Sequence, residues 1–292
     1  MPDSNKTQAN QVNNIPVVDI ATPNLSRVSH NVYKEFNVGE QGLVFNNSLE
    51  STTSQLAGQL NKNPNLRNRS ATLINNEVVG GNPSQLKGLI EVAGDAANVM
   101  ITNPNGVSIN GLSFKNINDI NINTGNLKFN KRKNLEELNL TKGHIYVGDD
   151  GIDATNTNSL SIFGRTLKLD GDIESNIIGV HAGAVSVDMN SSVHTPIEIG
   201  DPKPEFSIDT SDLGGIYANR IVVKSTEKGV GVNLNDIDGR HWLEINAPDS
   251  NVINVNGLLR TDENYAHIVG NILNDKGKLY KHLGNGLWSR FG

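Results

Sequence analysis

Hydrophobic and polar positions alternate over short distances in this chain, with Gly, Asn and Asp between the alternating stretches. Apolar residues at every second position are typical of half-buried β-strands. The strands expected from this pattern are 42–45, 71–74, 89–92, 99–102, 107–109, 120–122, 145–147, 242–245 and 252–255. Helical periodicity is sparse, and the two modest candidates are 48–60 and 131–140. The pattern therefore predicts an all-β fold.

Three segments in the second half of the chain share one pattern: IFGRTLKL (162–169), VHAGAVSV (180–187) and IYANRIVV (216–223). Their starts lie 18 and 36 residues apart, so both spacings are multiples of one period. A constant period is expected of a β-solenoid, in which each repeat adds one coil. We therefore predict a right-handed parallel β-helix, with a loop insertion in the proline-rich segment 194–206, where one repeat is missing.

This register predicts which side chains point into the coil. They are Ile162, Leu167, Leu169, Val180, Val185, Val187, Ile216, Ile221 and Val223. We also expect Trp242 to fill the coil interior and His181 to be a packed residue of a repeat strand.

Composition narrows the class of protein. Roughly one residue in seven is asparagine, which favours turns and can form amide ladders between strands in register. The net charge of −6 gives no reason to expect nucleic acid binding. The basic cluster of Lys128 and 131–133 is interpreted as a solvated loop. Because the chain has no cysteine, disulfides and thiolate metal sites are excluded.

The N-terminal segment MPDSNKTQANQVNN is polar and has no apolar core, so we expect no signal peptide in this chain. No run of about 18 apolar residues is present, so no transmembrane helix is expected. We expect residues 1–14 to be flexible, 15–258 to form the β-helix, and 259–292 to be a further coil or a cap.

Two similar turns punctuate the first half of the chain, Asn63-Pro64-Asn65-Leu66 and Asn103-Pro104-Asn105-Gly106. Proline presets φ for the second position of a turn, and the first Asn side chain can accept a hydrogen bond from the N–H two residues on. Asn105 or Gly106 can adopt a positive φ. We expect Asn103→Ile to remove one hydrogen bond, worth about 1 kcal/mol, and so to affect a local signal more than stability.

These turns lie in longer segments that carry a family resemblance: IPVVDIATPNLSRVSHNVYKEFNVGEQGLVFNN (15–47), LINNEVVGGNPSQLKGLIEVAGDAANVMITNPNGVSINGLSF (73–114) and DLGGIYANRIVVKSTEKGVGVNL (212–234). The chain resembles the two-partner secretion domain of filamentous haemagglutinin-like exoproteins, especially those of contact-dependent growth inhibition. The family favours Asn at the position of Asp19. Relatives often carry a Cys-x-x-Cys pair at positions that here are Ile109 and Leu112.

The resemblance implies a right-handed parallel β-helix with an N-terminal cap and small antiparallel sheets outside the coil. It implies recognition in the periplasm by an outer-membrane β-barrel transporter with polypeptide-transport-associated domains, followed by folding outside a Gram-negative cell as the template of a longer exoprotein. We expect a monomer, and contact with target cells through downstream regions. The residues implied in transporter recognition are the two turns, Asn63, Pro64, Asn65, Leu66, Asn103, Pro104, Asn105 and Gly106.

Two other classes of protein remain open. Parallel β-helices include polysaccharide lyases, whose sites need grouped carboxylates, and Asp149, Asp150 and Asp153 form the densest acidic group. We interpret that group as a solvated turn and expect no enzyme activity, metal or cofactor. The other alternative is a glycan-binding adhesin, but Trp242 and Trp288, which could form a sugar platform, are isolated in the sequence.

Overall fold

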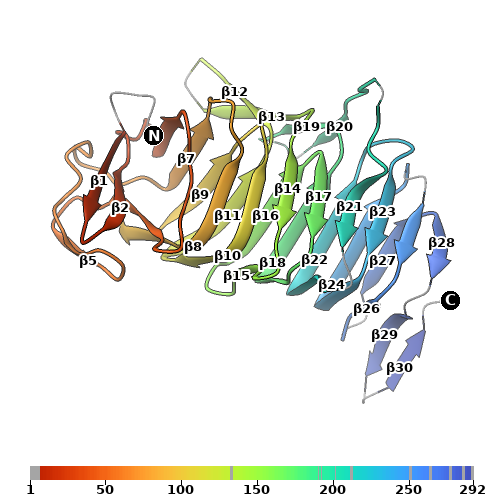
Figure 1. Ribbon diagram of the computed structural model, residues 1–292. Helices are drawn as coiled ribbons and strands as arrows, with labels where there is room; N and C mark the ends of the chain where they lie inside the picture. The colour runs from red at the N-terminus through yellow and green to blue at the C-terminus, as the bar shows by residue number, and fades with distance from the viewer. Residues whose placement is uncertain are drawn as a thin grey trace.

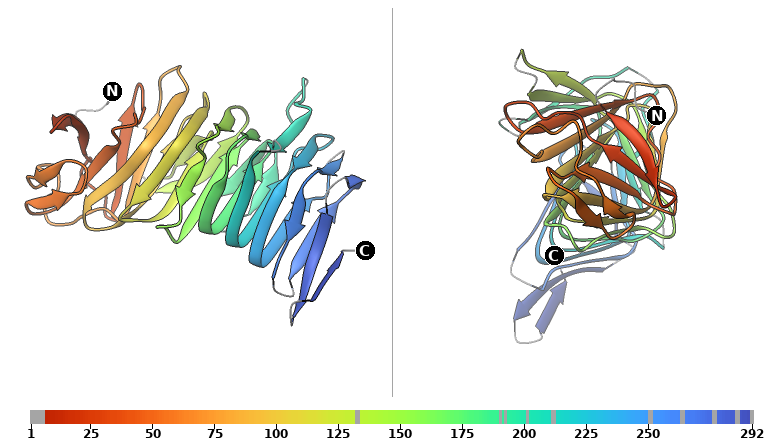
Figure 2. Two further views of the ribbon diagram at one scale, coloured as in Figure 1. Left: turned by 60° about the horizontal axis from the view of Figure 1, so that its bottom comes forward. Right: turned by 90° about the vertical axis from the view of Figure 1, so that its left-hand side faces the viewer.

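The computed structural model describes residues 7–290, except 132–133, 190, 192, 201, 211–212, 250–251, 263–264, 276–277 and 285–286. Within these residues the chain is all-β. It winds into an elongated parallel β-helix with the two ends of the chain at opposite ends of the long axis (Figures 1 and 2). No helix within the described ranges is long and apolar enough to cross a membrane.

Three parallel ladders, here called A, B and C, form the sides of the coil. Five long strands bend round a corner and join two ladders: β8 (Ser84–Gly94), β10 (Val107–Lys115), β18 (Ile173–Ala182), β22 (Gly215–Ser225) and β24 (Asp236–Ala247). Ladder A also holds β2 (Ile15–Asp19), β4 (Leu43–Asn47), β15 (Ile152–Ala154), β26 (Leu258–Arg260) and β29 (Lys278–Gly284).

Ladder B continues from ladder A in each coil. Its other strands are β3 (Val28–Tyr33), β7 (Leu73–Val78), β9 (Ala97–Thr102), β11 (Ile117–Asn123), β16 (Ser159–Gly164) and β27 (Ala266–Gly270). Ladder C closes the triangle through β14 (His144–Val147), β17 (Thr166–Leu169), β21 (Phe206–Thr210), β23 (Gly231–Leu234), β25 (Ile253–Val255) and β28 (Ile272–Asp275).

Stacked aliphatic side chains fill the interior. One column of ladder B runs through seven coils: Ile101, Ile122, Ile162, Val180, Val223, Ile245 and Ile268. β-branched residues suit this arrangement because their branched side chains pack well between neighbouring strands. The result is one continuous hydrophobic core along the whole coil.

Short antiparallel elements lie outside the coil, as the resemblance implies. Strand β1 (Gln8–Val12) pairs with β2, and the outer hairpin is β5 (Thr52–Ser54) with β6 (Gly58–Leu60). The outer sheet contains β12 (Asn126–Phe129), β13 (Leu135–Leu140), β19 (Val185–Asp188) and β20 (His194–Pro196). Both helix candidates, 48–60 and 131–140, are therefore wrong, because they lie in the outer hairpin and the outer sheet, where tertiary pairing overrides weak helical periodicity.

The parallel β-helix predicted from the repeat is confirmed. The predicted stacking of residues 18 positions apart is correct for one pair of neighbouring coils and wrong for the next. Ile162 does stack on Val180, yet Val180 then stacks on Val223, and Leu167 stacks on Ile208 of ladder C. Val185 and Val187 are buried in the outer sheet against Leu138 and Leu140, not in the coil. The coil keeps no fixed length because the outer sheet is inserted between ladders B and C.

Trp242 is also placed differently from the expectation. Its neighbour Leu243 is buried in the core, so alternation along β24 turns Trp242 outward. There its ring stacks on Tyr265, with 3.4 Å between ring centroids, and the Arg220 guanidinium lies 4.8 Å from its ring centre. His181 is packed as expected, between Phe163 and His194.

The structure describes part of each end of the chain. Within 1–14, where flexibility is expected from the sequence, Gln8–Val12 form β1, and residues 1–6 lie outside the described residues. At the other end, β26, β27 and β28 continue the parallel ladders past residue 258. The last pair, β29 and β30 (Leu287–Arg290), is antiparallel.

Candidate functional site

The Asn103–Gly106 turn connects ladder B to ladder C. The Gly106 N–H donates to the Asn103 carbonyl over 3.0 Å, which closes a four-residue turn with Pro104 in its second position. The Asn103 side-chain oxygen accepts from the Asn105 N–H over 3.0 Å, as predicted. Of the two residues expected to accept a positive φ, it is Gly106 that adopts one, +117°.

The Asn63–Leu66 turn has the same internal bonds at a different corner, between ladders A and B. The Leu66 N–H donates to the Asn63 carbonyl over 3.2 Å, and the Asn65 N–H donates to the Asn63 side chain over 2.8 Å. Leu66 stands where the other turn has glycine, and its side chain packs in the main core. The two turns contact different segments of chain, so the coil does not bring them together into one site.

Both leading asparagines are buried and hold neighbouring backbone as well as their own turn. The Asn103 amide donates to the Asn82 carbonyl and the Ser84 hydroxyl, each over 3.0 Å. The Asn63 amide donates to the Ile20 carbonyl over 3.0 Å and to the Asn46 carbonyl over 2.8 Å. The expectation that replacing Asn103 removes one hydrogen bond is therefore wrong. Four would be lost, because the Asn105 amide also donates to the Asn103 side-chain oxygen over 3.1 Å, and buried partners would be left unsatisfied.

A third turn led by an asparagine, Asn24–Arg27, escaped the sequence analysis. The Arg27 N–H donates to the Asn24 carbonyl over 3.0 Å, and the Asn24 side chain accepts from the Ser26 and Val28 N–H groups over 2.9 and 3.0 Å. The hydroxyl of Thr22, two residues before this turn, donates to the Asn65 carbonyl over 2.8 Å and so links this segment to the Asn63–Leu66 turn. Beside it lies a hollow of about 500 Å³ whose lining includes Leu25, a leucine 90% exposed.

Asp19, at a position where the family favours asparagine, lies beside the Asn63–Leu66 turn. Its carboxylate accepts from the Asn46 amide over 2.7 Å and from the Asn10 amide over 3.3 Å. Burial raises the pKa of Asp19, and these two donors lower it in part because they bind the charged form. Its backbone carbonyl accepts from the Asn65 amide over 3.2 Å. Asp19 therefore helps to position the turn.

Two members of the acidic group considered for catalysis lie in a turn, as interpreted from the sequence, whereas Asp153 lies in strand β15. Asp149 and Asp150 are exposed turn residues, and the Asp150 carboxylate accepts from the Asn110 side chain over 2.5 Å. Within the described ranges no three His, Cys, Asp or Glu side chains group closely enough to hold a metal ion. The relatives' cysteine positions, Ile109 and Leu112, are fully buried core residues here.

Lys128 of the basic cluster lies in β12 and pairs with Glu137 over 2.9 Å, while 132–133 lie outside the described residues. It is exposed, as expected of a solvated cation, but it belongs to a strand of the outer sheet, not to a loop.

The parallel β-helix with antiparallel elements outside the coil is the fold that the resemblance to secretion domains implies. A family model described as the TPS secretion domain matches residues 1–240, and the chain belongs to this family. The crystal structure of the filamentous hemagglutinin secretion domain is similar to this chain, with a TM-score of 0.77 and 30% identity over 97% of this chain and 98% of that one.

Relatives known by sequence include the tRNA nuclease CdiA of Yersinia mollaretii, 42% identical over 229 residues. The 16S rRNA endonuclease CdiA of Enterobacter cloacae is 38% identical over 241 residues. The matches cover 78% and 82% of this chain but 8% and 7% of those relatives. The chain is thus a two-partner secretion domain of a CdiA- or filamentous haemagglutinin-like exoprotein, a class that is secreted or surface-exposed in Gram-negative bacteria and has a partner outer-membrane transporter.

Proposed function

We propose that this domain is recognised before it folds, by the periplasmic polypeptide-transport-associated domains of its outer-membrane transporter. The chain then crosses the β-barrel unfolded and folds outside the cell, where its coils serve as a template for the exoprotein that follows. The parallel ladders support this proposal, because a strand added to an existing ladder avoids a new nucleation step.

The observation that carries the proposal is the double role of the two turn asparagines. Each closes a turn through contacts within four residues, which a chain in transit can form without the coil. In the folded domain the same side chains are buried, with Asn63 1% and Asn103 0% exposed. A transporter that reads these side chains must therefore meet the chain before the coil has closed over them.

Two substitutions distinguish recognition of the local turn from recognition that depends on the folded domain. Pro104→Ala removes the preset φ of the turn but leaves the hydrogen bonds of Asn103 in place. Ser84→Ala removes a buried acceptor of Asn103 that is present only after folding. We expect Pro104→Ala to weaken binding of the urea-unfolded chain to the isolated periplasmic domains by about fivefold, whereas Ser84→Ala leaves binding unchanged and costs about 1 kcal/mol of stability.

Binding is measured by pull-down and titration immediately after dilution from urea, and export is measured in cells that carry the transporter. Equal loss of binding in both variants would show that the turns act only through the fold. Unchanged binding and export in Pro104→Ala would reduce the turn to a scaffold.

We further propose that the domain has no enzyme activity of its own and acts as a monomer. The nuclease names of the CdiA relatives describe proteins of which this chain spans less than a tenth, so nuclease activity and contact with target cells are assigned to downstream regions. Turnover of a polyuronate that is lost in Asp150→Ala would contradict this proposal.

A further inference from the structure

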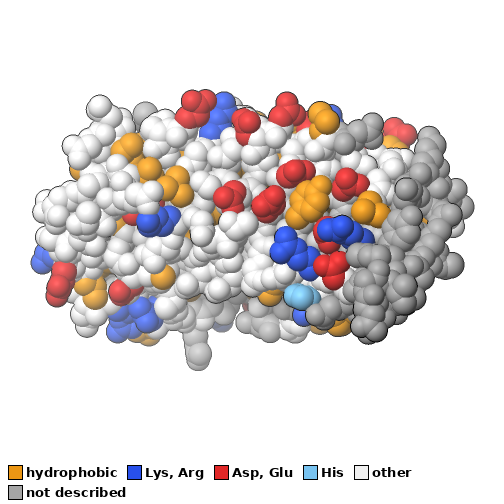
Figure 3. All heavy atoms as spheres, turned by 90° about the horizontal axis from the view of Figure 1, so that it is seen from below, with side chains coloured by type: hydrophobic (Ala, Val, Ile, Leu, Met, Phe, Trp, Pro, Cys, Tyr) orange, Lys and Arg blue, Asp and Glu red, His pale blue; other side chains and the backbone are white. Residues whose placement is uncertain are grey.

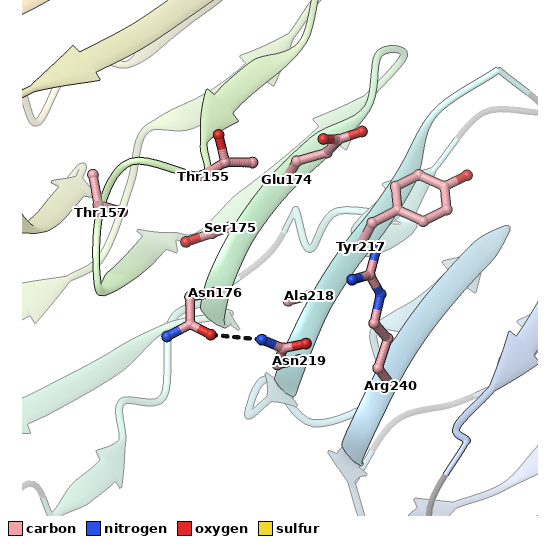
Figure 4. A pocket seen from close by; sticks show the side chains of 9 residues that line it. All are labelled: Thr155, Thr157, Glu174, Ser175, Asn176, Tyr217, Ala218, Asn219 and Arg240. Atoms are coloured by element: carbon pink, nitrogen blue, oxygen red, sulfur yellow. Dashed lines mark hydrogen bonds between the residues drawn. The ribbon is translucent and has the colours of Figure 1, made fainter.

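A polar groove runs along the corner between ladders A and B in the later coils. It has a volume of about 490 Å³ and extends across four successive coils, from Thr155 and Thr157 at one end to Arg240 at the other (Figure 4). Three steps between neighbouring strands span about 14 Å, the length of a short oligosaccharide. We call it the corner groove.

Small residues in register form the floor of the corner groove. Ala154, Ser175, Ala218 and Gly239 follow one another from coil to coil. A Cβ at Gly239 would lie 2.6 Å from the Trp242 carbonyl oxygen, so this position requires glycine. Ser175 lines the groove, and its buried hydroxyl has no hydrogen-bond partner within the described residues. The corner is hollow because no large side chain fills it.

Polar side chains with both donors and acceptors border this floor. The Asn219 amide donates to the Asn176 side-chain oxygen over 2.8 Å. Asn176 is exposed and Asn219 is half-buried, and both amides keep further groups for a ligand. Glu174 lies beside Tyr217 in register, and the Arg240 side chain extends toward Tyr217 from the next coil (Figure 4). Hydroxyl groups of a ligand would therefore meet amide, carboxylate, phenol and guanidinium partners.

Tyr217 supplies an aromatic surface. A Cβ built on Gly215 would lie 2.4 to 2.6 Å from three atoms of the Tyr217 ring, so the ring lies over Gly215 and needs glycine beneath it. One face of the ring covers backbone, and Tyr217 remains partly exposed. An amphipathic ring of this kind can pack against the apolar face of a sugar while its hydroxyl donates a hydrogen bond.

The charges around Tyr217 select against anions. Burial raises the pKa of Tyr217, and the carboxylates of Asp172, Asp236, Asp238 and Glu174 raise it further. Two cations lie here as well, because Arg240 lines the groove and Arg260 pairs with Asp238. The carboxylates outnumber these guanidinium groups, so the net negative charge disfavours an anionic ligand. The strands on both sides of this corner are paired in the parallel ladders, so within the described residues the groove offers no free strand edge to which a peptide could pair.

We propose that the corner groove binds an uncharged oligosaccharide that lies along the coil axis. Tyr217 stacks on a sugar ring, and Asn176, Asn219 and Arg240 form hydrogen bonds with its hydroxyl groups. The domain would then hold a neutral cell-surface glycan near the site where the exoprotein emerges, an activity separate from transporter recognition.

The test is calorimetric titration of the 292-residue chain with mannotriose, cellotriose and chitotriose, and with the anionic trigalacturonate. We expect at least one neutral trisaccharide to bind with a Kd of about 1 mM or tighter, and trigalacturonate to bind at least about fivefold more weakly. Tyr217→Ala and, as a milder second variant, Asn219→Ala should each weaken that binding by about fivefold or more.

The matched control is Tyr146→Ala, because Tyr146 lies on ladder C, away from the groove. It should bind the neutral sugar as the unchanged chain does. The proposal is overturned if no neutral trisaccharide binds, if trigalacturonate binds best, or if Asn219→Ala and Tyr217→Ala, checked for folding by circular dichroism, bind normally. Binding of an extended hydroxyl-rich peptide in preference to every sugar would equally overturn it.

Discussion

The early coils and the later coils of this β-helix use different interactions to hold the same fold. Eight asparagines are buried before residue 124, namely Asn31, Asn46, Asn47, Asn63, Asn75, Asn76, Asn103 and Asn123, whereas Asn235 is the one buried asparagine in the described part after it. The later coils rely on aliphatic columns and carry a cluster of charged side chains on the surface seen from below (Figure 3).

The difference follows from geometry. In the early coils the chain leaves the ladders for the outer hairpin and reverses direction between β1 and β2, so many backbone groups lack a strand partner. Asparagine amides supply both a donor and an acceptor to such groups. The later coils repeat parallel pairing, and where their chain leaves the ladders it pairs in the outer sheet, so strand pairing satisfies more of their backbone groups. Single residues therefore matter more in the early coils.

The largest effect is expected for Asn47→Ala. The Asn47 amide donates to the Ala71 and Asp95 carbonyls over 3.0 and 2.8 Å, and its side-chain oxygen accepts from the Ala71 N–H over 2.7 Å. Removing these bonds leaves buried backbone groups unpaired and should cost about 3 kcal/mol in urea unfolding. The exposed control Asn61→Ala should change stability by less than about 0.5 kcal/mol. A loss of stability near zero for both variants would contradict the idea that buried asparagines stabilise the early coils.

An intermediate effect is expected from pH, in the later coils. Burial, and then the neighbouring His194 and Lys224, lower the pKa of His181 from its ordinary 6.5 to about 3. The unfolded chain therefore binds a proton that the folded chain does not. Stability should be full well above pH 6.5 and should fall by up to about 1.4 kcal/mol per pH unit below it, so that about 2 kcal/mol is lost by pH 5.

The control for this effect is His181→Phe, which preserves the stack on Phe163 over the observed 4.4 Å but cannot titrate. Unfolding free energies measured by urea at several pH values should give a flatter profile for this variant. Parallel profiles for the two proteins would assign the pH dependence to other groups.

The smallest effect is expected in an aliphatic column of the later coils. Ile178 is fully buried and stacks between Leu160 and Ile221, so Ile178→Val should cost about 1 kcal/mol. Its neighbour Ile177 is 40% exposed, and Ile177→Val should be nearly neutral. Thermal unfolding of the pair measures this difference directly. A loss for Ile178→Val as large as that for Asn47→Ala would contradict the idea that the columns tolerate small changes.

The alternation of apolar residues determined the all-β class and the positions of most coil strands, and the Asn-Pro-Asn sequences determined the internal hydrogen bond of both turns. These features depend on contacts between residues close in sequence, such as the bond from the Asn105 N–H to Asn103. Register did not follow from the sequence. Val185 matches the repeat but lies in the outer sheet, because a hydrophobic pattern shows that a strand is half-buried and not which surface covers it.

Only the tertiary structure decided which distant residues meet. Asn103 closes its own turn by local rules, yet its bonds to Asn82 and Ser84 exist because the coil stacks that segment beside it. Tyr217, Asn176 and Arg240 are separated in sequence and line one groove because each lies at the same corner of successive coils. A solenoid sets these contacts by the length of each coil, and insertions such as the outer sheet vary that length without a periodic trace in the sequence.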